Sequence, residues 1–342
     1  MGPPPLALGD RHARAVKAIR VILERGGTPE SAHVVAGDVH ELRSGRSQSF
    51  GDPELATFWR SSMKPFQALP VVRDGVLARL GMGPEVLALA CASHHATQRH
   101  VDLVTSVLAA IELSPEALVC GPHRPFDADA AQQLDQAGVL PGRVHNNCSG
   151  QHAAMLALAV ARDWTVTGYH EPEHPLQQAV RAELSALLGL DCEGLPWGVD
   201  GCGLPTPALS LQEMARAYAR LGCSDEAPVR AVAAAMTAHP MLVSGPTALS
   251  ANVMRATSGR ILAKEGAEGL LCLASREAGW GAAFKVLDGA TRALGPAIVH
   301  ALSSLSLLSV EEADRLREFA RPAVSNTRGR EVAALSVERD GG

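Results

Sequence analysis

The sequence is organised around Arg60-Ser61-Ser62-Met63-Lys64-Pro65-Phe66-Gln67-Ala68-Leu69-Pro70. Pro65 marks the first turn of a helix, because the missing N–H of proline costs nothing where backbone donors lack intrahelical partners. Residues three apart lie on one helix face, so Ser61 and Lys64 are expected to project together from that turn. Pro70 lies one turn farther on and predicts a kink. The stretch therefore predicts a helix start that presents a serine beside a lysine.

A serine beside a lysine can carry out acyl transfer. The hydroxyl is a poor nucleophile until an adjacent base takes its proton, and a neutral lysine amine can be that base. Arginine cannot serve at neutral pH. Of the 31 basic residues only Lys17, Lys64, Lys264 and Lys285 are lysines, and the others are arginines. Ser-x-x-Lys also occurs at solvated helix starts, but the scarcity of lysine favours Ser61 as nucleophile and Lys64 as its base.

The composition narrows the class of protein. The chain has 342 residues, of which 46% are hydrophobic and 20% charged, which allows one large domain or two lobes. A net charge of −5 disfavours nucleic acid or an anionic membrane as partner. No apolar run reaches the ~20 residues of a spanning helix. The first residues lack the pattern of a secretory signal, so a cytoplasmic protein is expected, and its seven scattered cysteines are expected to be reduced.

Strand patterns occur at both ends of the chain and helical patterns between them. Short β-like pieces cover 20–23, 31–36 and 38–42, and others cover 260–264, 270–274, 282–287 and 331–338. Helices are expected at 84–91, from 97, from 114, and at 149–162, 175–188, 210–221, 228–238, 290–308 and 311–320. We therefore predict an α+β fold with one antiparallel sheet, built from N- and C-terminal segments, and a large helical lobe.

The expected domain organisation follows from these patterns. Residues 1–18 are interpreted as a flexible extension and 19–342 as a single catalytic domain. Its sheet lobe would comprise 19–60 and 257–342, and its mainly helical lobe 61–256. The active site is expected between the sheet and the helical lobe, where pockets commonly form.

Three further groups of residues could carry chemistry. Ser93, after an apolar helix, and Lys264, at a sheet edge, could face Ser61 and Lys64 across the cleft, although a turn or cap serine is the simpler interpretation of Ser93. Cys148 and His152 are four apart on a helix and could form a zinc set with Asp200 and Cys202; the glycines around Cys202 could instead mark tight turns. The cluster His94, His95 and His100 suggests acid–base chemistry, but a role at turns and on a helix surface is favoured.

Many ordered motifs together resemble one family. They are Arg25-Gly26-Gly27, Glu30 to His33, Gly51-Asp52-Pro53, Arg60 to Pro70, Cys91-Ala92-Ser93-His94, Asn146 to Gly150, Gly198 to Pro205, Lys264 to Gly269 and Lys285 to Gly289. From about Arg25 to Val337 the chain resembles the rhizobial-type, thermolabile L-asparaginase II family, which is related in fold to serine β-lactamases and glutaminases.

The resemblance implies a function for several residues. Ser61 would be the nucleophile and Lys64 its base, with Ser93 and Lys264 as a second Ser-Lys pair. The enzyme would hydrolyse the side-chain amide of asparagine through an acyl-enzyme, with backbone N–H groups holding the oxyanion. A homodimer and a zinc ion, bound by Cys148, Cys202 and a lysine, are also implied. The residues implied in substrate binding are Arg60, Asn147, His152, Asp200 and Gly201.

The chain departs from that pattern at three places. Gln151 stands where the family has its zinc-binding lysine, and a neutral amide is a poor zinc ligand beside thiolates; zinc would be weaker, completed by water, or absent. His95-Ala96-Thr97 replaces Ser-Gly-Glu. The segment 245–251 lacks the arginine and the acid of Gly-x-Gly-Arg-x-Asp-Thr, the kind of groups that grip an α-carboxylate and an α-amine. Our hypothesis is that the hydrolytic machinery is retained while amino-acid recognition is altered.

Two other functions compete with an asparaginase-type amidohydrolase. A penicillin-recognising acyl-serine enzyme shares the Ser-x-x-Lys arrangement, but the sequence has no Ser-Asp-Asn or Lys-Thr-Gly motif and no export signal. A non-catalytic homologue would keep the fold and bind a small amide or amino acid without turnover.

Overall fold

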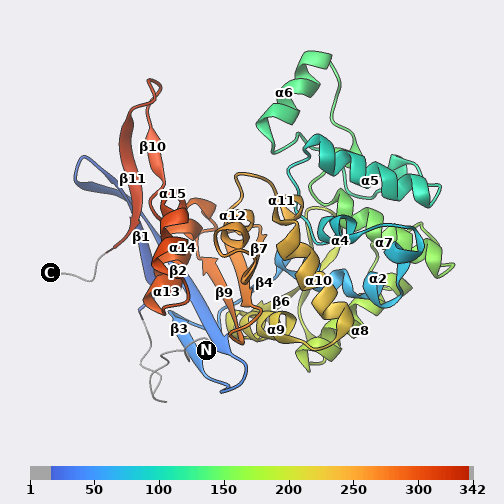
Figure 1. Ribbon diagram of the computed structural model, residues 1–342, viewed down its shortest axis with the longest axis horizontal. Coiled ribbons are helices and arrows are strands. Elements are labelled where there is room, and N and C mark those ends of the chain that lie inside the picture. Colours follow the sequence, from blue (N-terminus) through green and yellow to red (C-terminus); the bar gives the residue numbers. More distant parts are fainter. Residues whose placement is uncertain (1–16, 339–342) are drawn as a thin grey trace. The chain divides into compact units, whose positions relative to one another are not determined.

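The computed structural model describes residues 17–338, which form helices and antiparallel strands (Figure 1). Most of the expected 1–18 extension therefore lies outside the described residues. The chain divides into two compact units, which we call the sheet unit and the helical unit. Of the described residues, the sheet unit comprises 17–57, 209–223 and 252–338, and the helical unit comprises 58–208 and 224–251.

Antiparallel strands from both ends of the chain form the sheet of the sheet unit, in the order β10-β11-β1-β2-β9-β8-β7, with β3 paired to β2. The pairing of β1 with β11, in which Val21 is opposite Val337, joins the N- and C-terminal segments. The predicted α+β fold with one sheet from both ends is thus confirmed. The strands are β1 (Ile19–Arg25), β2 (Thr28–Glu41), β3 (Ser47–Phe50), β7 (Ile261–Gly266), β8 (Leu270–Ser275), β9 (Trp280–Val286), β10 (Ala323–Ser325) and β11 (Glu331–Val337). Two expected strands, 31–36 and 38–42, are parts of the single strand β2.

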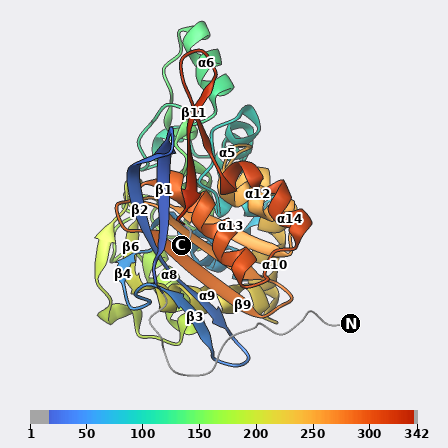
Figure 2. The ribbon, with the colours of Figure 1, turned by 90° about the vertical axis from the view of Figure 1, so that its left-hand side faces the viewer.

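Two helices pack on this sheet. Helix α9 (Leu211–Cys223) packs on β2, β8 and β9, and α13 (Leu294–Ser304) packs on β1, β9 and β11; Figure 2 shows α13 beside β1. A Cβ added to Gly281 of β9 would lie 2.1 Å from the Ala219 nitrogen of α9, so only glycine allows this approach. Although the sequence placed residues 211–223 in the helical lobe, the structure packs α9 on the sheet.

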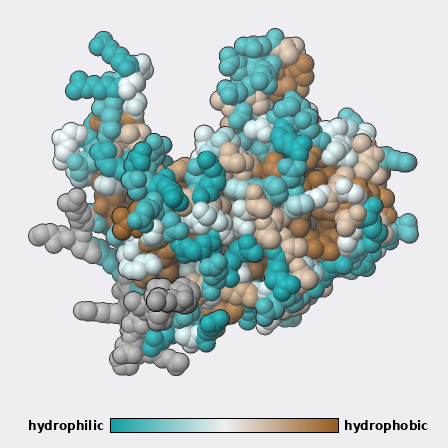
Figure 3. All heavy atoms as spheres, in the orientation of Figure 1, coloured by the Kyte–Doolittle hydropathy of each residue, from teal (hydrophilic) through white to brown (hydrophobic). Residues whose placement is uncertain are grey.

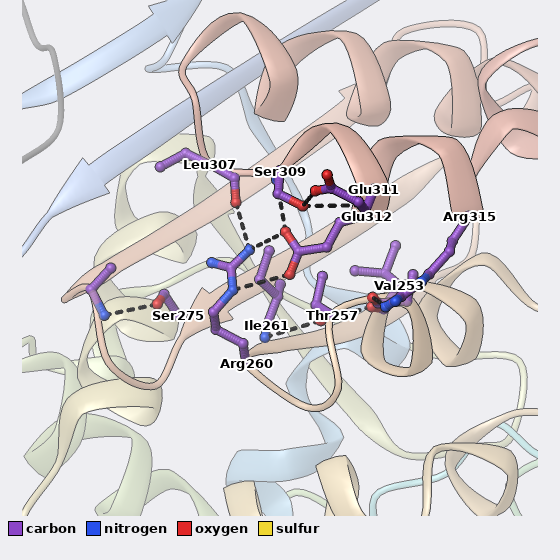
Figure 4. A network of polar contacts seen from close by, with 12 residues as sticks. Val253, Thr257, Arg260, Ile261, Ser275, Leu307, Ser309, Glu311, Glu312 and Arg315 are labelled. Atoms are coloured by element: carbon purple, nitrogen blue, oxygen red, sulfur yellow. Dashed lines mark hydrogen bonds and ion pairs between the residues drawn. The ribbon is translucent and has the colours of Figure 1, made fainter. Parts of the chain in front are cut away.

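A network of polar contacts ties the last helices to β7 (Figure 4). The Arg260 guanidinium donates to the Glu312 carboxylate at 2.6 Å and to the Leu307 carbonyl at 2.9 Å. Glu312 also closes a capping box with Ser309 at the start of α14 (Val310–Arg315). The predicted helix 311–320 is divided here into α14 and α15 (Arg317–Ala320).

The helical unit has α7 (Ser149–Ala161) at its centre, and eleven of the thirteen α7 residues are buried. A Cβ at Gly150 would lie 2.5 Å from Leu89 of α4, so this glycine lets the two helices pack closely. The other longer helices are α4 (Pro84–Ala90), α5 (Gln98–Ala110), α6 (Ala128–Ala137), α8 (Pro175–Leu188) and α10 (Ala227–Ala238). The helix expected from Ser114 is only a 3₁₀ turn, Pro115–Ala117, because Leu118 is extended.

An apolar groove of about 510 Å³ lies on the helical unit between α10 and the segment 71–87. Figure 3 shows hydrophobic surface over α2 (Leu69–Arg73) and α10. Throughout residues 17–338, each helix is too short or too polar to cross a membrane.

Candidate active site

Ser61 and Lys64 lie where β4 (Ala56–Phe58) gives way to helical turns. Arg60–Met63 form a 3₁₀ turn and α1 (Lys64–Gln67) follows at once. In a 3₁₀ turn residues i and i+3 are eclipsed, which places Ser61 and Lys64 on the same side. Lys64 is buried and Ser61 is half-buried. The helical segment is divided at Ala68 into α1 and α2, two residues before Pro70; the kink at Pro70 stays a prediction.

The amine of Lys64 donates three hydrogen bonds. The acceptors are the Ala92 carbonyl at 2.6 Å, Ser93 Oγ at 3.2 Å and Cys148 Sγ at 3.1 Å. Ser61 takes no part in these three bonds but lines the same small cavity as Lys64. Ser93 and Cys148, which the sequence analysis placed in separate groups, therefore accept hydrogen bonds from the same buried amine.

Arg60, the residue before Ser61, has an unusual backbone conformation. Its φ of +51° lies in the left-handed region, which costs a non-glycine residue about 1–3 kcal/mol. Two contacts hold it there: its N–H donates to Thr206 Oγ1 at 2.9 Å, and its guanidinium pairs with Asp200 Oδ1 at 2.8 Å. This conformation orients the turn that carries Ser61. The sequence analysis did not identify Thr206 as the acceptor for the Arg60 N–H, because an isolated threonine belongs to no recognisable motif.

The glycine-rich loop after β5 (Trp197–Val199) is a tight turn that also carries a thiol. The Gly201 N–H donates to Asp200 Oδ1 at 2.6 Å, and the Gly203 N–H donates to the Asp200 carbonyl at 2.9 Å. Gly203 has a φ of +92°, a conformation that favours glycine. Cys202 is buried within this turn, which returns into β6 (Pro205–Ser210).

Cys148 and Cys202 form a coupled pair of thiols. The hydrogen bond from Cys202 lowers the pKa of Cys148, and the positive charge of Lys64 lowers it further against the effect of burial. The same thiol–thiol hydrogen bond, together with burial, raises the pKa of Cys202. Cys148 is thus hydrogen-bonded to both Cys202 and Lys64.

Asn147 lies next to this pair, and hydrogen bonds to its backbone N–H and carbonyl fix its position. Its carbonyl accepts from the His94 N–H at 2.9 Å, and its own N–H donates to His123 Nε2 at 2.8 Å. Its side-chain Oδ1 lies 3.4 Å from Cys148 Sγ. Of the residues implied in substrate binding, Asn147 is therefore adjacent to the thiol pair, while Asp200 and Gly201 belong to the turn anchored by Arg60.

The zinc set expected from Cys148, His152, Asp200 and Cys202 is not formed. Among residues 17–338, no group of three or more His, Cys, Asp or Glu side chains is arranged to hold a metal ion. His152 is buried, and its Nδ1 lies 2.6 Å from the Tyr169 hydroxyl. Burial lowers the pKa of His152 to about 3. Asp200 is engaged with Arg60. The i, i+4 spacing places His152 in the core, where its Nε2 has no hydrogen-bond partner among the described residues.

Two of the clustered histidines are buried, which corrects the expected surface role. His94 Nε2 lies 2.9 Å from Ser149 Oγ, and the His94 and His100 rings stack at 4.9 Å. His100 closes a capping box with Thr97 at the start of α5. Burial lowers the pKa of both imidazoles, that of His100 to about 4. The pattern indicated helix termini correctly but carried no information on burial.

Lys264 lies in the sheet unit, near the middle of β7. Its side chain is buried, and its Nζ donates to the Glu265 carbonyl at 2.8 Å. The pairing of Lys264 with Ser93 stays a prediction, as does the location of the active site between the two lobes.

A family model describing L-asparaginase II matches residues 21–337. The chain belongs to the L-asparaginase II family. Membership of the L-asparaginase II family supports an amidohydrolase function. No curated protein sequence matches the chain.

Among solved structures, the chain is similar to a probable glutaminase from Bacillus subtilis complexed with 6-diazo-5-oxo-L-norleucine. The identity is 13%, the coverage 80% of this chain and 84% of the glutaminase, and the TM-score 0.37. A putative β-lactamase from Bacteroides dorei shows 12% identity, 84% and 94% coverage, and a TM-score of 0.39. The assignment to L-asparaginase II rests on the family model alone.

Two segments that depart from the L-asparaginase II pattern lie against each other. The His95 N–H donates to the Ser244 carbonyl at 2.9 Å, and a Cβ at Gly245 would lie 2.3 Å from His95 Nδ1. The Ser93 N–H also donates to the Val243 carbonyl, so this contact adjoins the hydroxyl bonded to Lys64. The altered segments 95–97 and 245–251 are therefore coupled by packing and lie beside Ser93.

The third departure concerns the zinc ion that the family resemblance implies. Gln151 is buried, and its Nε2 donates to Gln67 Oε1, while its own Oε1 has no hydrogen-bond partner among the described residues. The two cysteines offer the sulfur donors that zinc prefers, but the third position offers a neutral amide oxygen where the family pattern has a lysine nitrogen, and an amide is a poor zinc ligand beside thiolates. The residues present do not fit the ion.

Proposed function

We propose that this member of the L-asparaginase II family hydrolyses a primary carboxamide, such as the side-chain amide of asparagine, with Ser61 as nucleophile and Lys64 as base. The observation that carries the proposal is the buried Lys64 amine, which lines one cavity with Ser61 and donates to Ser93 Oγ at 3.2 Å. A lysine amine enclosed with two hydroxyls matches the requirement of a serine nucleophile for an adjacent base.

The proposed reaction proceeds in two halves. The amine that makes three hydrogen bonds is the charged form of Lys64. In the proposed reaction Lys64 first loses one proton, and the neutral amine then takes the proton of Ser61 as the Ser61 Oγ attacks the amide carbon. The proton then moves from Lys64 to the departing nitrogen, directly or through the Ser93 hydroxyl, so that ammonia leaves and an ester with Ser61 remains. In the second half a water gives its proton to Lys64 and attacks the ester, which releases the carboxylic acid and restores the Ser61 hydroxyl.

The proposed substrate is L-asparagine or a related amide, with recognition altered at the amino-acid end. The cations lining the small cavity are Arg60 and Lys64, and each already has partners: Arg60 pairs with Asp200, and Lys64 makes three hydrogen bonds. The coupled segments 95–97 and 245–251 also lack the charged residues that the family pattern carries there. Both observations favour weak binding of the α-carboxylate and α-amine of free asparagine.

The test is ammonia release from L-asparagine, L-glutamine and amides that lack a free α-carboxylate or α-amine. Release by the wild type, abolished in Ser61→Ala and Lys64→Met variants that remain folded, is the expected result. A higher kcat/KM for the blocked amides than for free asparagine is expected for altered recognition, and the reverse order would refute that part. If the folded wild type releases ammonia from none of these amides, the proposal fails, and binding of asparagine without turnover of any of them would identify a non-catalytic homologue.

A further inference from the structure

Gln151 stands at the position where the family pattern has a metal-binding lysine, and the polar groups around it already form hydrogen bonds with one another. Its Nε2 hydrogen-bonds to Gln67, which lies in α1 directly after the Ser61–Lys64 turn. The amide is thereby fixed, with its nitrogen facing Gln67. A lysine amine offers a nitrogen lone pair to zinc, whereas an amide offers only a weakly basic oxygen.

The two thiols are likewise engaged without a metal. Cys148 Sγ accepts from the Lys64 amine at 3.1 Å and from the Cys202 thiol. A zinc ion needs four ligands in a closed site. Asp200 is engaged with Arg60. His152 contacts Tyr169 through Nδ1, and its buried Nε2 has no hydrogen-bond partner among the described residues. Within residues 17–338, however, His152 is not part of any group of three or more His, Cys, Asp or Glu side chains arranged to hold a metal ion.

The space beside these groups is small. The cavity lined by Ser61, Lys64, Gln67, Gln151 and Cys202 has a volume of about 10 Å³, which is the room that one water molecule occupies. Gln151 Oε1 is buried without a partner among the described residues, and such an atom is usually satisfied by ordered water. The site thus has a place for a water and an acceptor that requires one.

We propose that this chain has replaced the zinc centre by a metal-free assembly. The Cys148–Cys202 thiol pair, the Gln67–Gln151 amide pair and one bound water hold the site together. In this assembly Cys148 is a positioning residue, because its sulfur fixes the Lys64 amine beside Ser93. The inference goes beyond the proposed hydrolysis, since the assembly would form whether or not the protein turns over an amide.

The experiment measures zinc retention by the purified full-length chain. The protein is incubated with zinc chloride, separated from free ion on a desalting column and analysed for zinc by atomic emission; affinities follow from competition with a chromophoric chelator. The wild type and a Cys148→Ala/Cys202→Ala double variant are expected to retain the same low level. A Gln151→Lys variant is expected to retain about one zinc per chain and to bind it at least about tenfold more tightly than the wild type.

The control for site identity is Gln151→Lys in the Cys148→Ala/Cys202→Ala background, which is expected to return to the low level. A wild type that retains stoichiometric zinc, lost in the double cysteine variant, would overturn the inference. That comparison stands even if Gln151→Lys fails to fold. A folded Gln151→Lys variant without zinc would overturn the role assigned to Gln151. Zinc retention requires no turnover, so its outcome is distinguishable from that of the ammonia assay.

Discussion

The amine of Lys64 lies 3.2 Å from the hydroxyl of Ser93, and both belong to the helical unit. Ser93 follows α4, and its own N–H is held by the Val243 carbonyl at 2.9 Å. Lys64 follows the 3₁₀ turn that carries Ser61. Because the Ser93 hydroxyl is hydrogen-bonded to Lys64, it can pass on the proton that the amine takes from Ser61 toward the departing nitrogen.

Removal of the Ser93 hydroxyl should therefore slow turnover without weakening substrate binding. Ser93→Ala is expected to lower kcat by about 10- to 100-fold with little change in KM, and Lys64→Met by about 10²- to 10⁴-fold, because only the latter removes the base. Steady-state ammonia release checks both values. Ser114→Ala, at a 3₁₀ turn outside the site, is the matched control and should behave as the wild type. Equal losses in Ser93→Ala and Lys64→Met would contradict the division of roles.

The left-handed conformation of Arg60 leads to an ordering of variant stabilities. Arg60→Gly relieves the strain of φ +51° but loses the pair with Asp200, whereas Arg60→Ala loses the pair and keeps the strain. Arg60→Gly is expected to be more stable than Arg60→Ala by about 1 kcal/mol in urea unfolding. Both should lower kcat/KM, because the turn carrying Ser61 loses its anchor.

Arg124 provides the matched control for Arg60, since it forms an exposed pair with Asp135 at 2.6 Å in the same unit. Arg124→Ala should leave activity and unfolding unchanged. If Arg60→Ala proved as stable as Arg60→Gly, the backbone strain at this position would have no energetic consequence.

His100 predicts a loss of stability in mild acid. Burial lowers its pKa from 6.5 to about 4 in the folded chain. The unfolded chain therefore binds a proton between pH 6.5 and pH 4 while the folded chain does not. The unfolding free energy should be independent of this group above pH 6.5 and decline as the pH falls toward 4, by up to about 3 kcal/mol. Urea unfolding at pH 7.5, 6 and 5 measures the slope.

His100→Gln should flatten that slope, whatever its effect on absolute stability. His300 is exposed on α13, so His300→Gln should retain the wild-type slope. An unchanged pH slope in His100→Gln would mean that another group is responsible for the acid sensitivity.

Glu312 should matter for stability more than its position near the chain end suggests. Its carboxylate pairs with Arg260 at 2.6 Å and closes the Ser309 capping box at 2.8 Å. Glu312→Ala is expected to lower the unfolding free energy by about 1–3 kcal/mol, since a charge-assisted pair and a cap are lost together. Asp314→Ala, which breaks only the exposed pair with Arg317, should cost less than about 0.5 kcal/mol. Similar losses in the two variants would contradict this network.

Local sequence patterns determined the secondary structure and part of the candidate site. Alternating apolar and polar residues and short apolar runs located β1, β7, β8, β9 and β11, because the pattern of apolar residues within a strand reflects which of its faces are buried. The Ser61–Lys64 pair was visible for the same reason, since a spacing of three within one turn is a local property. Cys148 and Cys202 were identified both from the spacing of possible metal ligands and from the family pattern, and the sequence carries both signals.

Only the tertiary structure decided which other side chains those residues contact. Cys148 bonds to Lys64, 84 positions away, and Gln151 bonds to Gln67, also 84 positions away. His94 and His100 became buried only when their neighbours packed around them. Arg60 is strained because Thr206 and Asp200 hold it there. A sequence specifies helices through contacts within a few residues, but the partners of a buried polar group come from distant segments, so folding has to bring them together.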